Sequence, residues 1–205
     1  MLDRWAVKVV RYPLKVMAAA ADRLSLSANQ ITVSGFLIGV IAFVAIAMEA
    51  YLVGLVFIAL NRIADGLDGA LARRHGITDA GGFLDISLDF LFYAMIPLAF
   101  VIADPVANGV AGGVLLTTFI GTGTSFLAFA SLAGKHGIEN PVYENKSIYY
   151  LGGIAEGTET ITCFVLFCLF PALFAEIAYL FAALCLITIV SRIYYGFRTL
   201  KAINQ

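Results

Sequence analysis

Four aspartates with regular spacing lie within a chain that is otherwise strongly apolar. Asp65 and Asp68 are three residues apart, and Asp85 and Asp89 are four apart. Residues at these separations share one face of a helix, so each pair presents two carboxylates in one direction. Four carboxylates placed together without a counter-ion would repel one another and be driven to bind protons. The spacing therefore predicts a site that binds divalent cations through oxygen ligands, with Mg²⁺ or Mn²⁺ as the suitable ions.

The residues beside the aspartates suit a bound phosphate. Gly69 and Ala72 share one face just beyond the first pair and leave space there, and Arg73 can hold a phosphate. Gly81 and Gly82 open the next predicted helix, where the backbone can approach a ligand closely. Four carboxylates also suffice for two metal ions, which can clamp a phosphoryl group between its attacking and leaving oxygens. We therefore expect a cavity shaped for a pyrophosphate that carries a flat group.

The rest of the chain indicates that these carboxylates belong to a membrane protein. Of its 205 residues, 61% are hydrophobic and 13% are charged, whereas a soluble domain is typically about half apolar and a quarter charged. Apolar stretches of about 20 residues predict membrane-spanning helices. These fall at 29–49, 51–74, 82–104, 107–133, 148–170 and 172–194. We predict an all-α membrane protein with a six-helix bundle over 29–194, forming a single domain over 1–205.

Charge distribution predicts how this bundle sits in the membrane. Residues 1–25 predict an amphipathic helix on the membrane surface, because apolar positions at helical spacing oppose a basic stripe. All 13 Lys and Arg residues fall on or near one side of the bundle, and the opposite loops carry only Glu49, Asp104 and Glu176. By the positive-inside rule, both termini and the aspartates face the cytoplasm of a bacterial-type inner or plasma membrane. A net charge of -1 without a long basic run argues against a nucleic-acid partner.

The spacing of the aspartates and glycines also resembles a family signature. The pattern D-G-x-x-A-R, seven residues, G-x-x-x-D-x-x-x-D is typical of the CDP-alcohol phosphotransferases, also called CDP-alcohol phosphatidyltransferases. Every fixed position is present here, at Asp68, Gly69, Ala72, Arg73, Gly81, Asp85 and Asp89, with the family's upstream aspartate at Asp65. A Pro-Asn pair found in many members is Ala28-Asn29 in this chain. The resemblance implies six spans, an N-terminal interfacial helix and a homodimer.

The resemblance also implies roles for individual residues. Asp65, Asp68 and Asp85 would bind metal, and Asp89 would both bind the second metal and act as the general base. The CDP site would be lined by Gly69, Ala72, Arg73 and Gly81. The implied reaction transfers a substituted phosphoryl group from a CDP-linked donor, usually CDP-diacylglycerol, to an alcohol acceptor and releases CMP. It would use two divalent ions, Mg²⁺ or Mn²⁺.

Ionisable residues outside the signature predict an acceptor pocket and leave its chemistry open. Glu156 and Glu159 are expected two to three turns into the fifth predicted span, where they would favour a polyol or an amine. Lys135 and Arg192 would instead recruit an anionic acceptor such as a sugar phosphate. Arg62, one turn before the first aspartate, either forms a structural ion pair inside the bundle or takes part in function.

Two other functions fit part of the pattern. An aspartate-rich membrane prenyltransferase also holds a diphosphate through Mg²⁺, but it usually carries two aspartate-rich motifs on helices that are distant in sequence. A cation transporter would use the carboxylates as an ion path, which leaves the Gly-Ala-Arg spacing unexplained. Release of CMP from CDP-diacylglycerol, set against ion flux in liposomes, distinguishes these alternatives.

Overall fold

The computed structural model describes residues 17–19, 21–137 and 153–203, and within them the chain is helical with short turns. The helices are α2 (Ala28–Ala47), α3 (Tyr51–His75), α4 (Asp79–Ala103), α5 (Pro105–Lys135), α6 (Gly157–Leu169) and α7 (Phe174–Ile203), with a 3₁₀ turn η1 (Pro171–Leu173) before α7. The expected all-helical class is confirmed. Of the predicted interfacial helix over 1–25, residues 17–19 and 21–23 are helical, while 1–16 and 20 lie outside the described residues.

Four of the described helical stretches are long and apolar enough to cross a membrane. They are α2, α4, α5 and the stretch Pro171–Ala202, which contains η1 and most of α7. The 25-residue α3 has sufficient length for a crossing, but its second half carries both aspartates of the first pair and several basic residues. The 13-residue α6 is only about 20 Å long, shorter than a hydrocarbon core of about 30 Å.

The extent predicted for the fifth span is wrong. In the structure the helix begins at Gly157 rather than at 148, because Glu156 takes the N-cap position with extended backbone torsions. The Glu159 carboxylate accepts a hydrogen bond of 3.2 Å from the Glu156 amide and satisfies a donor that the helix itself leaves free. Residues 153–156 are therefore not helical, and 148–152 lie outside the described residues.

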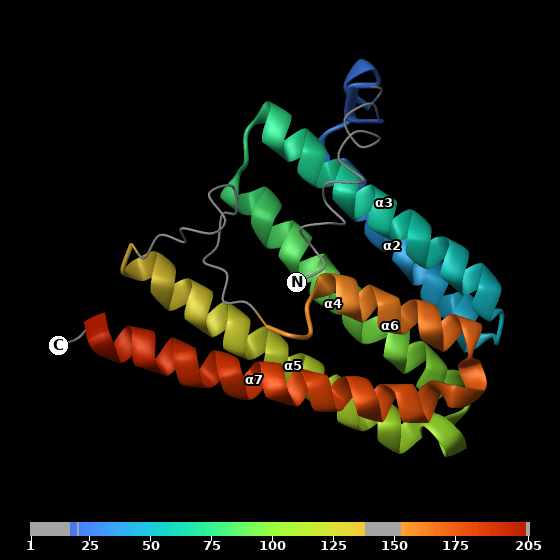
Figure 1. Cartoon of the computed structure of the whole chain (residues 1–205). Helices are drawn as coiled ribbons and strands as arrows, with labels where there is room; N and C mark the ends of the chain where they lie inside the picture. The colour runs from blue at the N-terminus through green and yellow to red at the C-terminus, as the bar shows by residue number, and fades with distance from the viewer. Residues whose placement is uncertain (1–16, 20, 138–152, 204–205) are drawn as a thin grey trace.

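The helices pack as two groups that meet through α4 (Figure 1). α2 packs against α3 and α4, α5 packs against α7, and α4 also contacts α5. The short α6 contacts both α3 and α7 and so links the two groups. This arrangement places the aspartate-bearing ends of α3 and α4 beside each other.

Aromatic side chains fill the centre of the core. Phe92 of α4, Phe164 and Phe167 of α6, and Phe174 of α7 are all at most 1% exposed. Successive ring centroids lie 6.3, 6.2 and 4.5 Å apart along this series, and Phe100 lies 5.0 Å from Phe174. These separations fall within the range in which aromatic pairs attract one another. The contacts between these rings therefore hold α4, α6 and α7 together in the apolar core.

A close contact at Gly35 fixes α2 against α3. A Cβ atom added to Gly35 would lie 2.9 Å from the Cβ of Ala64, so only glycine permits this approach. Asn61 reinforces the contact, because its side-chain amide donates a hydrogen bond of 2.8 Å to the Gly35 carbonyl. The face of α3 that carries Asp65 and Asp68 is thereby held at a fixed position.

The turn between α3 and α4 is three residues long and brings the end of α3 close to the start of α4. Gly76 follows α3 with a φ of +105°, a left-handed conformation that favours glycine. Thr78 then caps α4 by accepting a hydrogen bond of 3.1 Å from the Gly81 amide. The end of α3 is also held by Asp22, whose carboxylate lies 2.6 Å from the Arg74 guanidinium and 2.7 Å from His75.

Candidate active site

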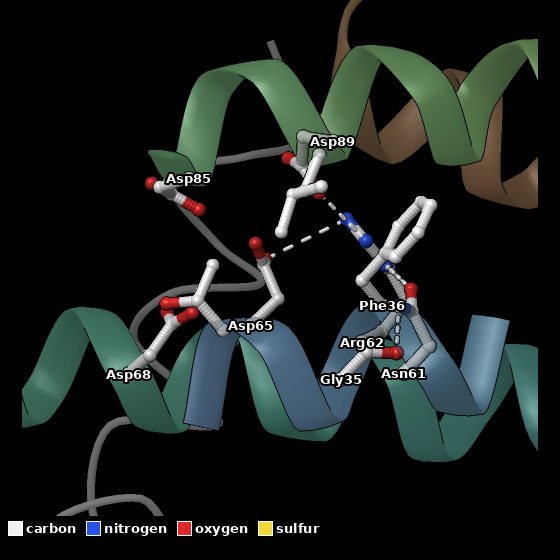
Figure 2. Close-up of a pocket in the computed structure, with 10 residues that line it drawn as sticks. Gly35, Phe36, Asn61, Arg62, Asp65, Asp68, Asp85 and Asp89 are labelled. Carbon is white, nitrogen blue, oxygen red and sulfur yellow. Dashed lines mark hydrogen bonds and ion pairs between the residues drawn. The ribbon is translucent and has the colours of Figure 1, made fainter. Parts of the chain in front are cut away.

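The four aspartates of α3 and α4 line one pocket. Figure 2 shows Asp65 and Asp68 on α3 opposite Asp85 and Asp89 on α4. Asp68 is only 4% exposed, whereas the side chains of Asp65 and Asp89 are 37% and 29% exposed. The pocket therefore combines one buried carboxylate with two that are partly accessible to solvent. Its other lining residues are Thr32, Gly35, Phe36, Asn61, Arg62 and Leu88.

Three of these aspartates suit a divalent cation. Asp65, Asp68 and Asp85 each offer one carboxylate oxygen, and the three oxygens all lie within 4.8 Å of one another. Oxygens bound to one Mg²⁺ at about 2.1 Å are separated by about 3 to 4 Å. A small inward movement of the carboxylates is enough to reach this geometry, and the charge of the ion favours it. The chemistry of the donor set, all carboxylate oxygen, also fits Mg²⁺ or Mn²⁺.

Asp89 has a different partner from the other three. Its Oδ1 accepts a hydrogen bond of 2.8 Å from Nη2 of Arg62, and Nη1 of the same guanidinium lies 3.6 Å from Asp65 Oδ2. Figure 2 shows the guanidinium on the side of the pocket away from Asp68. The structure therefore arranges three carboxylates around one position and turns the fourth towards an arginine.

The four residues expected at the CDP site lie outside the lining of the pocket, on the last two turns of α3 and the first turn of α4. Arg73 is exposed and reaches back along α3, since a Cβ atom on Gly69 would lie 3.3 Å from its Nη1. A Cβ atom on Gly81 would lie 3.1 Å from the side-chain oxygen of Asn29, at the start of α2. Ala72 is partly buried on the last turns of α3. Among the described residues, these four are close to the aspartates along the helices but do not line their pocket.

The residues expected to form an acceptor pocket fall into two places. The segment that precedes α6 contacts α7, because the Thr188 hydroxyl accepts hydrogen bonds of 3.1 and 3.0 Å from the Ile154 and Ala155 amides. One turn further along α7, Arg192 is 7% exposed and donates a hydrogen bond of 3.1 Å to the Thr122 carbonyl of α5. Glu156 thus lies in a segment that packs beside the face of α7 carrying Arg192.

The other two residues expected at the acceptor pocket, Glu159 and Lys135, lie elsewhere. Glu159 belongs to the first turn of α6 and bonds to the Glu156 amide, so the expectation that both glutamates lie two to three turns inside a helix is wrong. The cause is the late start of α6, where the two residues form the helix cap. Lys135 is the exposed last residue of α5 and lies about 20 Å along the helix from Thr122, the partner of Arg192.

Several pocket residues were not identified from the sequence. Asn61 has a detectable signal, because it precedes Asp65 by four residues and Asp68 by seven and so shares their helix face. Thr32 and Phe36 of α2 and Leu88 of α4 have no such signal. Their places in the pocket depend on how α2 packs against the other two helices.

With this fold and aspartate site, the chain belongs to the CDP-alcohol phosphatidyltransferase family, whose model matches residues 25–194. It is therefore a membrane transferase of phospholipid synthesis, and the family expected from the signature is confirmed. The chain is 55% identical to the inner membrane protein YnjF of Escherichia coli over 205 residues, which covers 100% of both chains.

Two further similar proteins carry the name of an enzymatic activity. The archaetidylinositol phosphate synthase of Pyrococcus horikoshii is 28% identical over 193 residues, which covers 94% of this chain and 95% of that protein. The crystal structure of the phosphatidylinositol phosphate synthase of Mycobacterium tuberculosis with CDP-DAG bound matches with a TM-score of 0.73 at 20% identity, covering 90% of this chain and 93% of that chain. The same enzyme is also known in complex with manganese and citrate. These structures share the fold of this chain.

Proposed function

We propose that this enzyme transfers a phosphatidyl group from CDP-diacylglycerol to an alcohol acceptor and releases CMP. The observation that carries this proposal is the cluster of Asp65, Asp68 and Asp85, whose oxygens lie within 4.8 Å of one another in a pocket that Asp89 completes. Such a cluster is suited to binding divalent ions that neutralise a diphosphate. The solved relative that binds CDP-DAG has the same fold, which supports this choice of donor.

Each aspartate has a role in this proposal. Asp65, Asp68 and Asp85 hold a first Mg²⁺ or Mn²⁺, and Asp89 contributes to a second. The bound ions supply positive charge to the diphosphate and its leaving group. Around the α3–α4 turn, Arg73 binds a donor phosphate. The small residues Gly69, Ala72 and Gly81 leave room there for the CDP part of the donor.

The reaction that follows from this arrangement is a substitution at phosphorus. Asp89 accepts the hydroxyl proton of the acceptor, and the acceptor oxygen forms a bond to the phosphorus that carries diacylglycerol. The bond between this phosphorus and the oxygen bridging to the CMP phosphate breaks, and CMP leaves with that electron pair. Asp89 afterwards releases its proton to solvent. The exposure of Asp89 is compatible with both transfers.

Two acceptor chemistries remain open, and the candidate residues favour one each. Glu156 and Glu159 favour a polyol or an amine, whereas Lys135 and Arg192 favour an anionic sugar phosphate. The names of the two synthases support the second choice, since both act in making inositol phosphate lipids. Of the two cations, Arg192 lies on α7 beside the segment that carries Glu156, whereas Lys135 is the last residue of α5.

The proposal includes an arrangement in the membrane. α3 and the segment that ends in the short α6 join the four apolar stretches to give six crossings in one domain over 1–205, with an interfacial helix over 1–25. Both termini and the aspartates face the cytoplasm of an inner membrane, which the basic residues and the name of the 55% identical relative support. We propose a homodimer, as in the family pattern.

The test is CMP release by purified protein in detergent with labelled CDP-diacylglycerol and Mg²⁺ or Mn²⁺. The acceptor panel contains inositol phosphate, glycerol phosphate, serine, amines and polyols, and lipid products are identified by mass. We expect metal-dependent CMP release with one acceptor class. No CMP release with any acceptor, or release from the Asp68→Asn variant at the wild-type rate, would contradict the proposal.

A further inference from the structure

Arg62 is a charged residue inside the bundle to which the proposed reaction gives no role. It lies on α3 one turn before Asp65, and its side chain is only 17% exposed. Its guanidinium contacts Asp89 of α4 at 2.8 Å and Asp65 of α3 at 3.6 Å, two carboxylates that face each other across the pocket (Figure 2). An arginine within a membrane protein is costly to bury, so its position calls for a functional explanation.

The guanidinium is held on several sides, which fixes where it can point. Its Nε donates a hydrogen bond of 2.8 Å to the Asn61 side-chain oxygen, and Asn61 in turn donates to the Gly35 carbonyl of α2. Nη1 donates a hydrogen bond of 3.3 Å to the Tyr93 hydroxyl. The guanidinium carbon also lies 4.6 Å from the centre of the Phe92 ring, within reach of a cation–π attraction. Contacts from α2, α3 and α4 thus set one orientation.

This orientation directs one nitrogen at Asp89. Each other nitrogen of the guanidinium has a partner of its own, so Nη2 is the one that bonds to Asp89 Oδ1. We propose that Arg62 is a positioning residue that orients the Asp89 carboxylate towards the acceptor and places a fixed positive charge beside the metal cluster. The inference rests on the proposed function, because it assigns Asp89 as the general base.

The proposal makes two effects of Arg62 separable. Loss of the guanidinium leaves Asp89 free to rotate, which slows transfer while the donor site around Arg73 stays intact. Loss of its positive charge removes a repulsion of divalent ions, so the aspartate cluster should bind metal more tightly. If Arg62 served only to hold the fold together, its loss would distort the aspartate cluster. The cluster would then bind its metal ion less tightly, not more tightly.

The experiment compares Arg62→Gln and Arg62→Lys with wild type and with Arg198→Gln as a matched control. Arg198 lies on the last turns of α7, where it contacts Tyr194. Steady-state rates are measured with CDP-diacylglycerol and the acceptor found above. Mn²⁺ binding to the substrate-free protein is measured separately by the electron paramagnetic resonance signal of free Mn²⁺. Thermal unfolding in detergent checks that each variant is folded.

For Arg62→Gln we expect kcat to fall about 10-fold or more with the donor KM within about twofold, and Mn²⁺ to bind about threefold tighter or more. Arg62→Lys keeps the charge without the planar fork, so Mn²⁺ affinity should stay near wild type and kcat should recover in part. Arg198→Gln should match wild type in both measurements.

Two results would overturn the inference. One is unchanged kcat in Arg62→Gln, and the other is Mn²⁺ affinity that is unchanged or weaker, with turnover restored by excess Mn²⁺. A wild-type protein that releases no CMP with any acceptor refutes the proposed function instead. In that case the Mn²⁺ measurement alone tests the role of Arg62. An unaltered Mn²⁺ affinity in Arg62→Gln would show that its positive charge does not affect the metal cluster.

Discussion

Asp89 and Asp68 are chemically identical residues in different surroundings. Asp68 is almost fully buried and belongs to the three-carboxylate cluster, whereas Asp89 is partly exposed and bonds to Arg62. A buried, clustered carboxylate suits a metal ligand. An accessible carboxylate held by one cation suits a group that exchanges a proton with substrate and solvent.

Replacing each of these aspartates by asparagine should therefore give different defects. Asparagine keeps one oxygen but is not a useful base, so Asp89→Asn should retain donor binding and lose transfer by about 100-fold or more. Asp68→Asn should weaken donor and metal binding together. Donor affinity and turnover are measured separately at saturating Mg²⁺. Normal turnover by Asp89→Asn, or full recovery of its activity with more metal, would make Asp89 only a ligand.

Arg73 should act on the donor rather than on the chemistry. It is exposed at the end of α3 and lies alongside Gly69. Arg73→Lys keeps the charge and loses the planar fork that binds two phosphate oxygens, so the donor KM should rise by about fivefold or more while the fold persists. Steady-state kinetics with CDP-diacylglycerol test this, and an unchanged donor KM would contradict the role.

The sequence predicts individual site residues better than it predicts their partners. The spacings of Asp65–Asp68 and Asp85–Asp89 give shared helix faces, and a short turn brings the end of one helix close to the start of the next. The bond between Arg62 and Asp89 joins residues that are 27 apart and depends on how α3 and α4 both pack against α2. The spacing of residues along one helix does not predict such packing, so the sequence leaves the role of Arg62 open.

Among the elements, α2 and α3 depend on their contact at Gly35. The carbonyl of Gly35 binds Asn61, which in turn holds Arg62, so the packing of two helices determines the orientation of a charged side chain. The lengths of α2, α4 and α5 follow from apolar runs and their caps and were predicted within a few residues. The start of α6 was predicted wrongly. The stretch 148–170 indicates a single apolar span, although Glu156 and Glu159 within it form a polar helix cap.

Gly35→Ala should destabilise the protein more than Gly113→Ala does. Both changes add one methyl group to a helix and gain the same helix propensity. At Gly35 the new Cβ would lie 2.9 Å from Ala64, whereas at Gly113 nothing among the described residues lies within 4 Å. We expect a cost of about 1–3 kcal/mol at Gly35 only. Thermal unfolding in detergent measures it, and equal melting temperatures for the two variants would contradict the close contact.

At the scale of the whole molecule, the charged site lies at one end of an apolar bundle. The turn between α3 and α4 carries the basic end of α3, and the opposite end of α4 meets α5 at Asp104. This asymmetry predicts both an orientation in the membrane and a dependence on metal. The orientation could be predicted from the sequence because it needs only the distribution of basic residues along the chain.

Two single-cysteine variants test the orientation. Ile77→Cys lies in the α3–α4 turn and Val106→Cys at the start of α5, at positions that are 53% and 97% exposed, whereas the native cysteines are buried. In intact spheroplasts a membrane-impermeant maleimide should label Val106→Cys only. Ile77→Cys should react after lysis. Labelling in the reverse order would place the aspartates on the outer side.

Removal of divalent ions should abolish transfer. The pocket is lined by four carboxylates and one arginine, so without metal it offers little positive charge to neutralise the diphosphate of the donor. We expect CMP release to cease in excess chelator and to return when Mg²⁺ or Mn²⁺ is added back. Full turnover in excess chelator would exclude the metal site.

The aromatic core has a consequence for the membrane itself. Arg62 lies over the ring of Phe92, and from Phe92 the contacting rings of Phe164, Phe167 and Phe174 continue into the apolar interior. In this direction the charged pocket ends against packed aromatic side chains, which offer ions and water no polar partner. The rings thus help the surrounding membrane to hold a proton gradient next to a charged site.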